Sequence, residues 1–175
     1  LQVYNPAGEV VLSITHFIGH LDGEHEQATI HSGAYSFDGR FLFVGSDEEI
    51  RIWGAQDGEY IKDIDVEEPV TAMASFPLSD FLYVGDASGC LTLYGLTREC
   101  NEQGALIGLK VHTLTHIRLH QDEITYICIA LDRNLLFTSS TDGNVAIVSL
   151  LTGALLGYLE SHEPLTSVSV ISGVP

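Results

Sequence analysis

The chain has 175 residues, of which 45% are hydrophobic and only 18% are charged, and it contains 17 glycines. Seven lysines and arginines face 24 aspartates and glutamates, which gives a formal net charge of −17. A surface of this sign repels phosphate backbones and anionic lipids, so direct binding to nucleic acid is not expected. No apolar run approaches the roughly 20 residues that a membrane-spanning helix needs, so membrane insertion is not expected either.

The three cysteines Cys90, Cys100 and Cys128 are odd in number and show no Cys-x-x-Cys spacing. Neither a zinc site nor a disulfide framework is expected from them, and free thiols favour a reducing compartment. We therefore expect an intracellular protein, cytoplasmic or cytoskeletal, with ciliary and nuclear locations left open. The sequence begins with neither a methionine nor a charged-then-apolar leader, which indicates an excerpt or a processed piece.

One sequence pattern recurs along the chain: an apolar strand, a short polar turn, and a second strand that ends near an aromatic or branched residue. Its copies begin at Phe41, Phe81 and Leu135, the first two 40 residues apart and the third 54 residues further on. A polar insertion at 97–108 explains the longer interval, and we expect it to form a surface loop. An incomplete copy opens the chain at 1–9.

Each complete copy predicts four antiparallel strands, because short apolar or alternating runs are separated by turns rich in glycine, aspartate and asparagine. The predicted units, in chain order, are the end of a first unit at 1–14, a second at 28–66, a third at 70–119 with the insertion 97–108, a fourth at 124–161, and the start of a fifth at 165–175.

Four antiparallel strands about every 40 residues resemble a blade of a WD-repeat β-propeller. The resemblance implies an all-β fold with about three complete blades and two partial ones, an excerpt of a seven-bladed ring. The residues that carry it are the pairs Trp53–Gly54 and Gly19–His20, the histidines His120 and His162, which are 42 residues apart, and the turns at 36–39 and 140–143.

In that family a histidine, a serine or threonine, an aspartate and a tryptophan commonly form a hydrogen-bonded network within each blade. The fourth unit offers His120, Ser140 and Asp142, but Val148 stands where the tryptophan is expected. No unit carries the full set, so we expect apolar packing to dominate, with partial polar contacts worth ~1 kcal/mol per hydrogen bond. The candidate network residues are His20, Ser46, Trp53, Tyr94, His120, Ser140, Asp142 and His162.

Three histidines, His112, His116 and His120, would line one face of a helix at a spacing that suits a metal. Apolar residues and threonines alternate with them, which is strand periodicity, so we expect a solvated row on an outer strand. A pH response of this row is a secondary hypothesis. The sequence contains no GxSxG elbow and no glycine-rich phosphate loop, so we expect no catalytic residue, metal ion or cofactor, and no enzyme.

In a WD-repeat propeller the loops between blades share one rim with the turns between second and third strands. Mapped onto this sequence, that rim gathers acidic residues, and none of the lysines and arginines is expected there. Two interpretations stay open: a docking face for a basic protein segment, or a solubilising surface. The residues of this acidic rim are Asp22, Glu24, Glu26, Asp47, Glu48, Glu49, Glu67, Glu68, Asp86, Asp122, Glu123, Asp142 and Glu163.

The resemblance implies a non-catalytic scaffold that mediates protein–protein contacts within a larger intracellular hetero-complex. Its expected partners are proteins with basic segments, because the rim carries charge of one sign. The alternative is an accessory, non-catalytic subunit of an enzyme complex, such as a methyltransferase or a ubiquitin ligase. The sequence does not choose between these settings.

Overall fold

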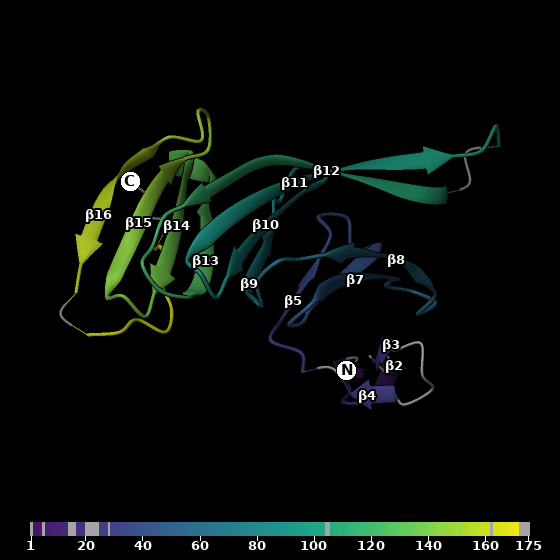
Figure 1. Ribbon diagram of the computed structural model, residues 1–175. Coiled ribbons are helices and arrows are strands. Elements are labelled where there is room, and N and C mark those ends of the chain that lie inside the picture. The colour runs from purple at the N-terminus through teal and green to yellow at the C-terminus, as the bar shows by residue number, and fades with distance from the viewer. Residues whose placement is uncertain are drawn as a thin grey trace.

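The computed structural model of the chain describes residues 2–4, 6–13, 17–19, 25–27, 29–103, 106–161 and 163–171. Over these residues the fold is built of β-strands, with a single 3-10 turn at Leu131–Arg133. Three four-stranded antiparallel sheets follow one another along the chain (Figure 1). The predicted all-β fold of four-stranded antiparallel units is therefore confirmed. Within the described part of the chain, no helix is long and apolar enough to cross a membrane.

Each four-stranded sheet is a meander, in which strands that are neighbours in the sequence pair with one another. Short polar turns permit this order, because an antiparallel pair needs only a hairpin connection. The first sheet contains β5 (Ser32–Tyr35), β6 (Phe41–Gly45), β7 (Glu49–Gly54) and β8 (Tyr60–Asp65); the second contains β9 (Val70–Ser75), β10 (Phe81–Asp86), β11 (Cys90–Cys100) and β12 (Leu106–Arg118); the third contains β13 (Ile124–Ala130), β14 (Leu135–Ser140), β15 (Asn144–Ser149) and β16 (Leu155–Glu160).

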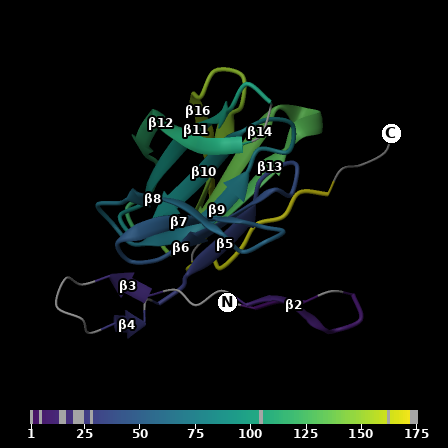
Figure 2. The ribbon, with the colours of Figure 1, turned by 90° about the vertical axis from the view of Figure 1, so that its right-hand side faces the viewer.

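Two short hairpins precede the sheets. β1 (Gln2–Tyr4) pairs with β2 (Val10–Ser13), and β3 (Phe17–Gly19) pairs with β4 (His25–Gln27). Figure 2 shows both hairpins on the side of the first sheet, below the stack of sheets. The sequence suggested strands within 1–14 but not the second hairpin, whose residues show no clear alternation of apolar and polar side chains.

A separate apolar core lies between each pair of neighbouring sheets. Ile50 and Ile52 of the first sheet pack with Leu82 of the second, and all three are fully buried. Ile124 and Leu136 of the third sheet are fully buried in the next core. Burial of one such side chain contributes about 1.5–3 kcal/mol, so these cores are the main force that holds the stack together.

The first strand of each sheet approaches the second strand of the preceding sheet at a glycine. A Cβ atom placed on Gly45 would lie 2.6 Å from Cγ1 of Val70, and one on Gly85 would lie 2.7 Å from Cγ2 of Ile124. Real Cβ atoms essentially never come so close, so a larger residue at either position would force the sheets apart. Beside this contact, the hydroxyl of Thr71 donates a hydrogen bond to the carbonyl of Ile124 at 2.6 Å.

The segment 165–171 was predicted to begin another strand, but it forms no strand in the structure. It still occupies the position, against the third sheet, that the first strand of a following sheet would take. The N–H of Leu165 donates to the carbonyl of Ser140 at 3.1 Å, just as the N–H of Val70 donates to that of Ser46 at 3.0 Å. The hydroxyl of Thr125 donates to the carbonyl of Leu165 at 2.8 Å. Leu165 therefore contacts the third sheet as Val70 contacts the first, but no described strand lies beside it to complete a ladder.

The insertion at 97–108 does not form the expected surface loop. Its first part continues β11 and its last part begins β12, so the two strands form a long antiparallel ribbon that extends past the second sheet toward β8 (Figure 1). Arg98 anchors this ribbon. Its guanidinium donates to Asp80 of the second sheet and to Asp38 of the first, each at 2.7 Å, and lies 5.1 Å from the ring centre of Phe41.

The Arg98 anchor predicts a pH dependence of stability. The hydrogen bond from Arg98 holds the pKa of Asp38 well below its usual range. This stabilisation is therefore complete above the unfolded-state pKa of about 3.9 and is lost as the pH falls through the folded-state value. We expect Arg98→Met to lower the free energy of unfolding by about 1–3 kcal/mol at pH 7, and we expect the difference from the wild type to shrink below about pH 3.

Urea denaturation of the full-length protein at several pH values measures this difference. The control is Arg133→Met, which removes a more exposed arginine that pairs with Asp132 at 3.8 Å. That substitution should change the free energy of unfolding by less than about 0.5 kcal/mol. A deficit in the Arg98 variant that stays constant down to pH 2 would show that its charge pairing is not what stabilises the ribbon.

Candidate functional site

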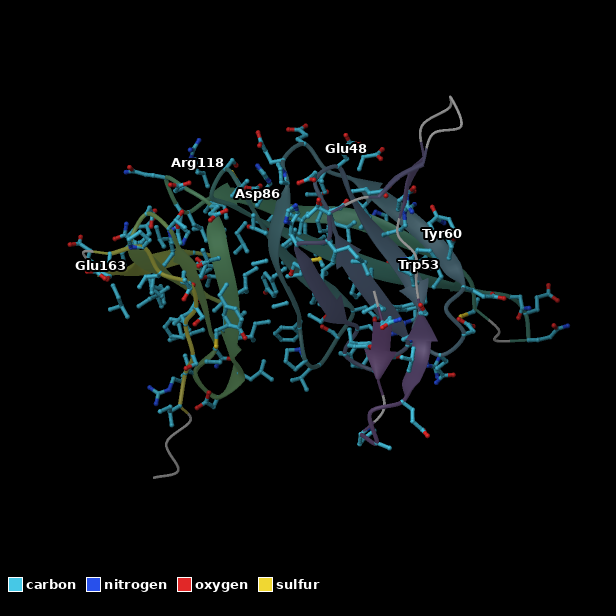
Figure 3. The ribbon with its side chains drawn as sticks, turned by 90° about the horizontal axis from the view of Figure 1, so that it is seen from below. Glu48, Trp53, Tyr60, Asp86, Arg118 and Glu163 are labelled. Atoms are coloured by element: carbon cyan, nitrogen blue, oxygen red, sulfur yellow. The ribbon has the colours of Figure 1, made fainter. Side chains whose placement is uncertain are left out.

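Most of the acidic rim residues that the structure describes lie in the turns after the second strands and in the loops before the first strands, while Asp86 ends β10 and Glu49 begins β7. Glu48 and Asp86 lie along one edge of the molecule (Figure 3). Asp22 and Glu24 fall outside the described residues, and Glu26 lies in β4. The exposed members are Asp47, Glu48, Glu67, Glu68, Asp122 and Glu163, whereas Glu49, Asp86, Glu123 and Asp142 are half-buried.

Two arginines lie close to this rim, and both belong to strands and not to its turns or loops: Arg51 to β7 and Arg118 to β12. Arg118, at the end of β12, lies on the same edge as Asp86 (Figure 3), and its Nε donates to the carbonyl of His120 at 3.2 Å. Arg51 pairs with Glu49 at 2.5 Å, and burial raises the pKa of Glu49. Glu49 and Arg51 are two residues apart in β7, so alternation places their side chains on the same face of the strand. Glu49 is therefore held within the first sheet.

The third sheet contains a polar network centred on His120, which is 3% exposed. Its Nδ1 lies 3.2 Å from Oδ2 of Asp142, and its Nε2 lies 2.8 Å from Oγ1 of Thr138. Burial lowers the pKa of His120, although Asp142 acts in the opposite direction, so the ring is neutral. A neutral ring with Nδ1–H donating to the carboxylate accepts the Thr138 hydroxyl proton at Nε2.

The sequence pattern predicts Ser140 as the hydroxyl partner in this network, whereas the structure places Thr138 there. The structure shows that Ser140 serves the turn: its hydroxyl donates to the carbonyl of Asp122 at 3.1 Å and accepts the N–H of Asp142 at 3.1 Å. Residues 138 and 140 point to the same face of β14, so alternation alone does not distinguish them. Thr138 is the partner, and Ser140 is not, because the ring of His120 lies beside the hydroxyl of Thr138.

The other candidate network residues have separate surroundings. The hydroxyl of Ser46 donates to the carbonyl of Glu49 at 3.0 Å and so closes the turn between β6 and β7. Trp53 packs edge-to-face on Tyr60 with ring centres 5.7 Å apart, and its Nε1 has no hydrogen-bond partner among the described residues. Tyr94 belongs to the first core. The remaining two candidates, His20 and His162, lie outside the described residues.

The three histidines of β12 and its end do not form one solvated row. A bulge in the pairing of β11 with β12 leaves Leu114 between partners and shifts the alternation after His112. His116 lies beyond the bulge, with Nδ1 2.8 Å from Oγ1 of Thr92, and His120 is buried. In the part of the chain that the structure describes, no cluster of histidine, cysteine, aspartate and glutamate is suited to a metal ion.

A groove of about 520 Å³ opens between the first and second sheets, beside the acidic rim. Four carboxylates and one arginine line it, so its charge is strongly negative. Hydroxyl-bearing side chains and His116 form much of the remaining wall. The charged lining residues are Asp65, Glu67, Glu68, Asp86 and Arg118; the hydroxyl residues are Ser88, Thr92, Tyr94 and Thr113.

One carboxylate of this groove, Asp86, is held rigidly. Its Oδ1 accepts hydrogen bonds from the N–H and the hydroxyl of Ser88, at 2.9 and 2.8 Å, and from the N–H of Cys90 at 2.9 Å. No described residue donates to its Oδ2. Burial, and after it the charge of Asp86, raises the pKa of the nearby Tyr94. The groove therefore presents a fixed carboxylate oxygen beside a phenol.

The sequence pattern predicts Glu67, Glu68 and Asp86 on the rim but does not indicate the groove. Two of its other residues, Asp65 and Arg118, belong to the fourth strands β8 and β12, where polar side chains are ordinary. Their sequence neighbours give no sign of a site. They come together only because the two sheets pack against each other, which no pattern within a single repeat reports.

The comparisons with known proteins agree with the repeat pattern. A family model described as WD domain, G-beta repeat (WD40) matches residues 11–54 and 109–149, and both spans end with the third strand of a sheet. No curated protein matches the sequence. Two solved structures, one of U3-55K and one of the RRP9 WD40 repeats, are similar with TM-scores of 0.64 and 17% identity over 79% of this chain. The chain spans 41% of the length of each structure. At this identity the likeness establishes the fold and not a shared activity.

The His120 network predicts the effect of removing one hydroxyl. Thr138→Val keeps the shape of the side chain but leaves Nε2 of the buried His120 without its partner. We expect the free energy of unfolding to fall by about 1–3 kcal/mol, since an unsatisfied buried polar group carries its full desolvation cost. The control is Thr115→Val on the exposed part of β12, which should change it by less than about 0.5 kcal/mol.

Denaturation of the full-length protein between pH 5 and 8 is the measurement. The folded-state pKa of His120 lies below its usual value of 6.5, so its neutral network is complete above about pH 6.5 and is weakened by acidification. Equal stability of the Thr138 and Thr115 variants at pH 7.5 would mean that the network does not stabilise the third sheet.

Proposed function

We propose that this chain, a member of the WD-repeat family, is part of a non-catalytic scaffold that holds protein partners within a larger complex. WD40 repeats generally mediate protein–protein contacts. The stack supports such a role physically, because fully buried side chains such as Phe43, Leu82 and Leu136 keep the sheets in fixed positions. A rigid platform binds its partners without having to order itself first.

The acidic rim is the docking face in this proposal, and its partners are protein segments rich in lysine or arginine. The observation that carries the proposal is the run of exposed carboxylates at Glu48, Glu67, Glu68 and Asp122, beside a groove that itself holds four carboxylates. Charge of one sign on a concave surface speeds the approach of an opposite charge and selects for it. Binding of this kind weakens as salt is added.

Capture of partners by the full-length protein at low and high salt tests this proposal. The rim variant combines Glu48→Lys, Glu67→Lys and Glu68→Lys. Its matched control combines Glu59→Lys, Glu102→Lys and Asp132→Lys, which make the same change of charge at exposed positions away from the rim.

We expect basic partners to be captured at low salt and released at high salt, and we expect the rim variant to capture them about tenfold less well than the control variant. Capture that is equal for both variants and independent of salt would leave the rim as a solubilising surface only.

A further inference from the structure

We propose that the groove between the first and second sheets binds a single lysine or arginine side chain of a basic partner segment, and that Asp86 and Tyr94 contact its cationic group. This inference rests on the proposed function above and assigns a specific site to it. The groove, rather than the rim as a whole, then determines where on the rim a partner docks.

The first observation is the charge of the groove. Asp65, Glu67, Glu68 and Asp86 line it, against the single cation of Arg118. The Nε of Arg118 is engaged with the carbonyl of His120, and no described carboxylate lies within ion-pair distance of its guanidinium. The carboxylates of the groove are therefore not neutralised from within, and a cation that enters meets a net negative wall.

The second observation is independent of the acidic cluster and concerns Tyr94. Its side chain is 9% exposed and lines the groove, yet its hydroxyl has no hydrogen-bond partner among the described residues. The oxygen of this hydroxyl is not among the fully buried polar atoms, so a group that enters the groove can reach it. The hydroxyl of Tyr94 is the kind of group that a bound donor would satisfy.

The third observation is the preorganisation of Asp86. Three hydrogen bonds to Oδ1, from Ser88 and Cys90, fix the carboxylate, while Oδ2 receives none from the described residues. The turn also requires Gly89, whose φ is +85° and whose added Cβ would lie 2.6 Å from the carbonyl oxygen of His120. A lysine ammonium or an arginine guanidinium has donors to spare for both oxygens, and charge-assisted bonds of this type are the strong ones.

The test is the binding of fluorescein-labelled hexalysine to the full-length protein, followed by fluorescence anisotropy at low salt, with hexaglutamate as the negative probe. Asp86→Asn removes the charge but keeps an acceptor for the turn, and Tyr94→Phe removes only the hydroxyl. Asp122→Asn is the matched control for charge on the same rim. Tyr83→Phe, in the second core, is the matched control for the loss of a tyrosine hydroxyl.

We expect the dissociation constant to rise about tenfold for Asp86→Asn and about three- to tenfold for Tyr94→Phe, and less than about twofold for both controls. If Asp86→Asn does not fold, the paired variant Glu67→Gln and Glu68→Gln takes its place, because both side chains are exposed. Equal weakening by Asp86→Asn and Asp122→Asn, with no effect of Tyr94→Phe, would overturn the groove but leave the acidic rim as the docking face. Wild-type protein that binds hexalysine no better than hexaglutamate would overturn both.

Discussion

The stack depends on one close contact, in which the first strand of a sheet reaches the backbone of the preceding sheet at a glycine. Val70 meets Gly45 in this way and Ile124 meets Gly85, with no room for a Cβ atom in either place. Because the contact repeats, each sheet positions the next, and the two apolar cores close around it. The segment at Leu165 makes the equivalent hydrogen bonds against the third sheet.

This contact also builds the candidate site. The groove has one wall from the loop after β8 and the other from β10, β11 and β12, so its shape depends on how closely the first two sheets approach. Arg98 bridges the same two sheets through Asp38 and Asp80. These two links, together with the three hydrogen bonds that Asp86 accepts, set the shape of the groove before a partner binds, which is the property that a docking platform needs.

Much of the fold could be predicted from the sequence, because strand alternation and turn residues act within a repeat. The recurrence that begins at Phe41 and Phe81 predicts four-stranded sheets, and the structure contains them. The errors concern contacts between units. The ribbon around Arg98 was expected to be a loop because many of its residues are polar. It is held in place by hydrogen bonds from Arg98 to Asp38 and Asp80, which belong to different sheets. Thr138 was missed because it shares its strand face with Ser140. Tyr94 was expected in a blade network and not in the groove, because the sequence does not report that its hydroxyl has no partner.

The most direct test of the account is the stability of Gly85→Ala in the full-length protein, compared with Gly157→Ala. A Cβ at position 85 would meet Ile124 at 2.7 Å, whereas a Cβ at position 157 has no neighbour within 4 Å. Both substitutions place the same methyl group in a strand, so any difference reports the space between the sheets. We predict that the free energy of unfolding falls by about 1–3 kcal/mol for Gly85→Ala and by less than about 0.5 kcal/mol for Gly157→Ala. Equal stability of the two variants would contradict the claim that close contact at a glycine holds the sheets in place.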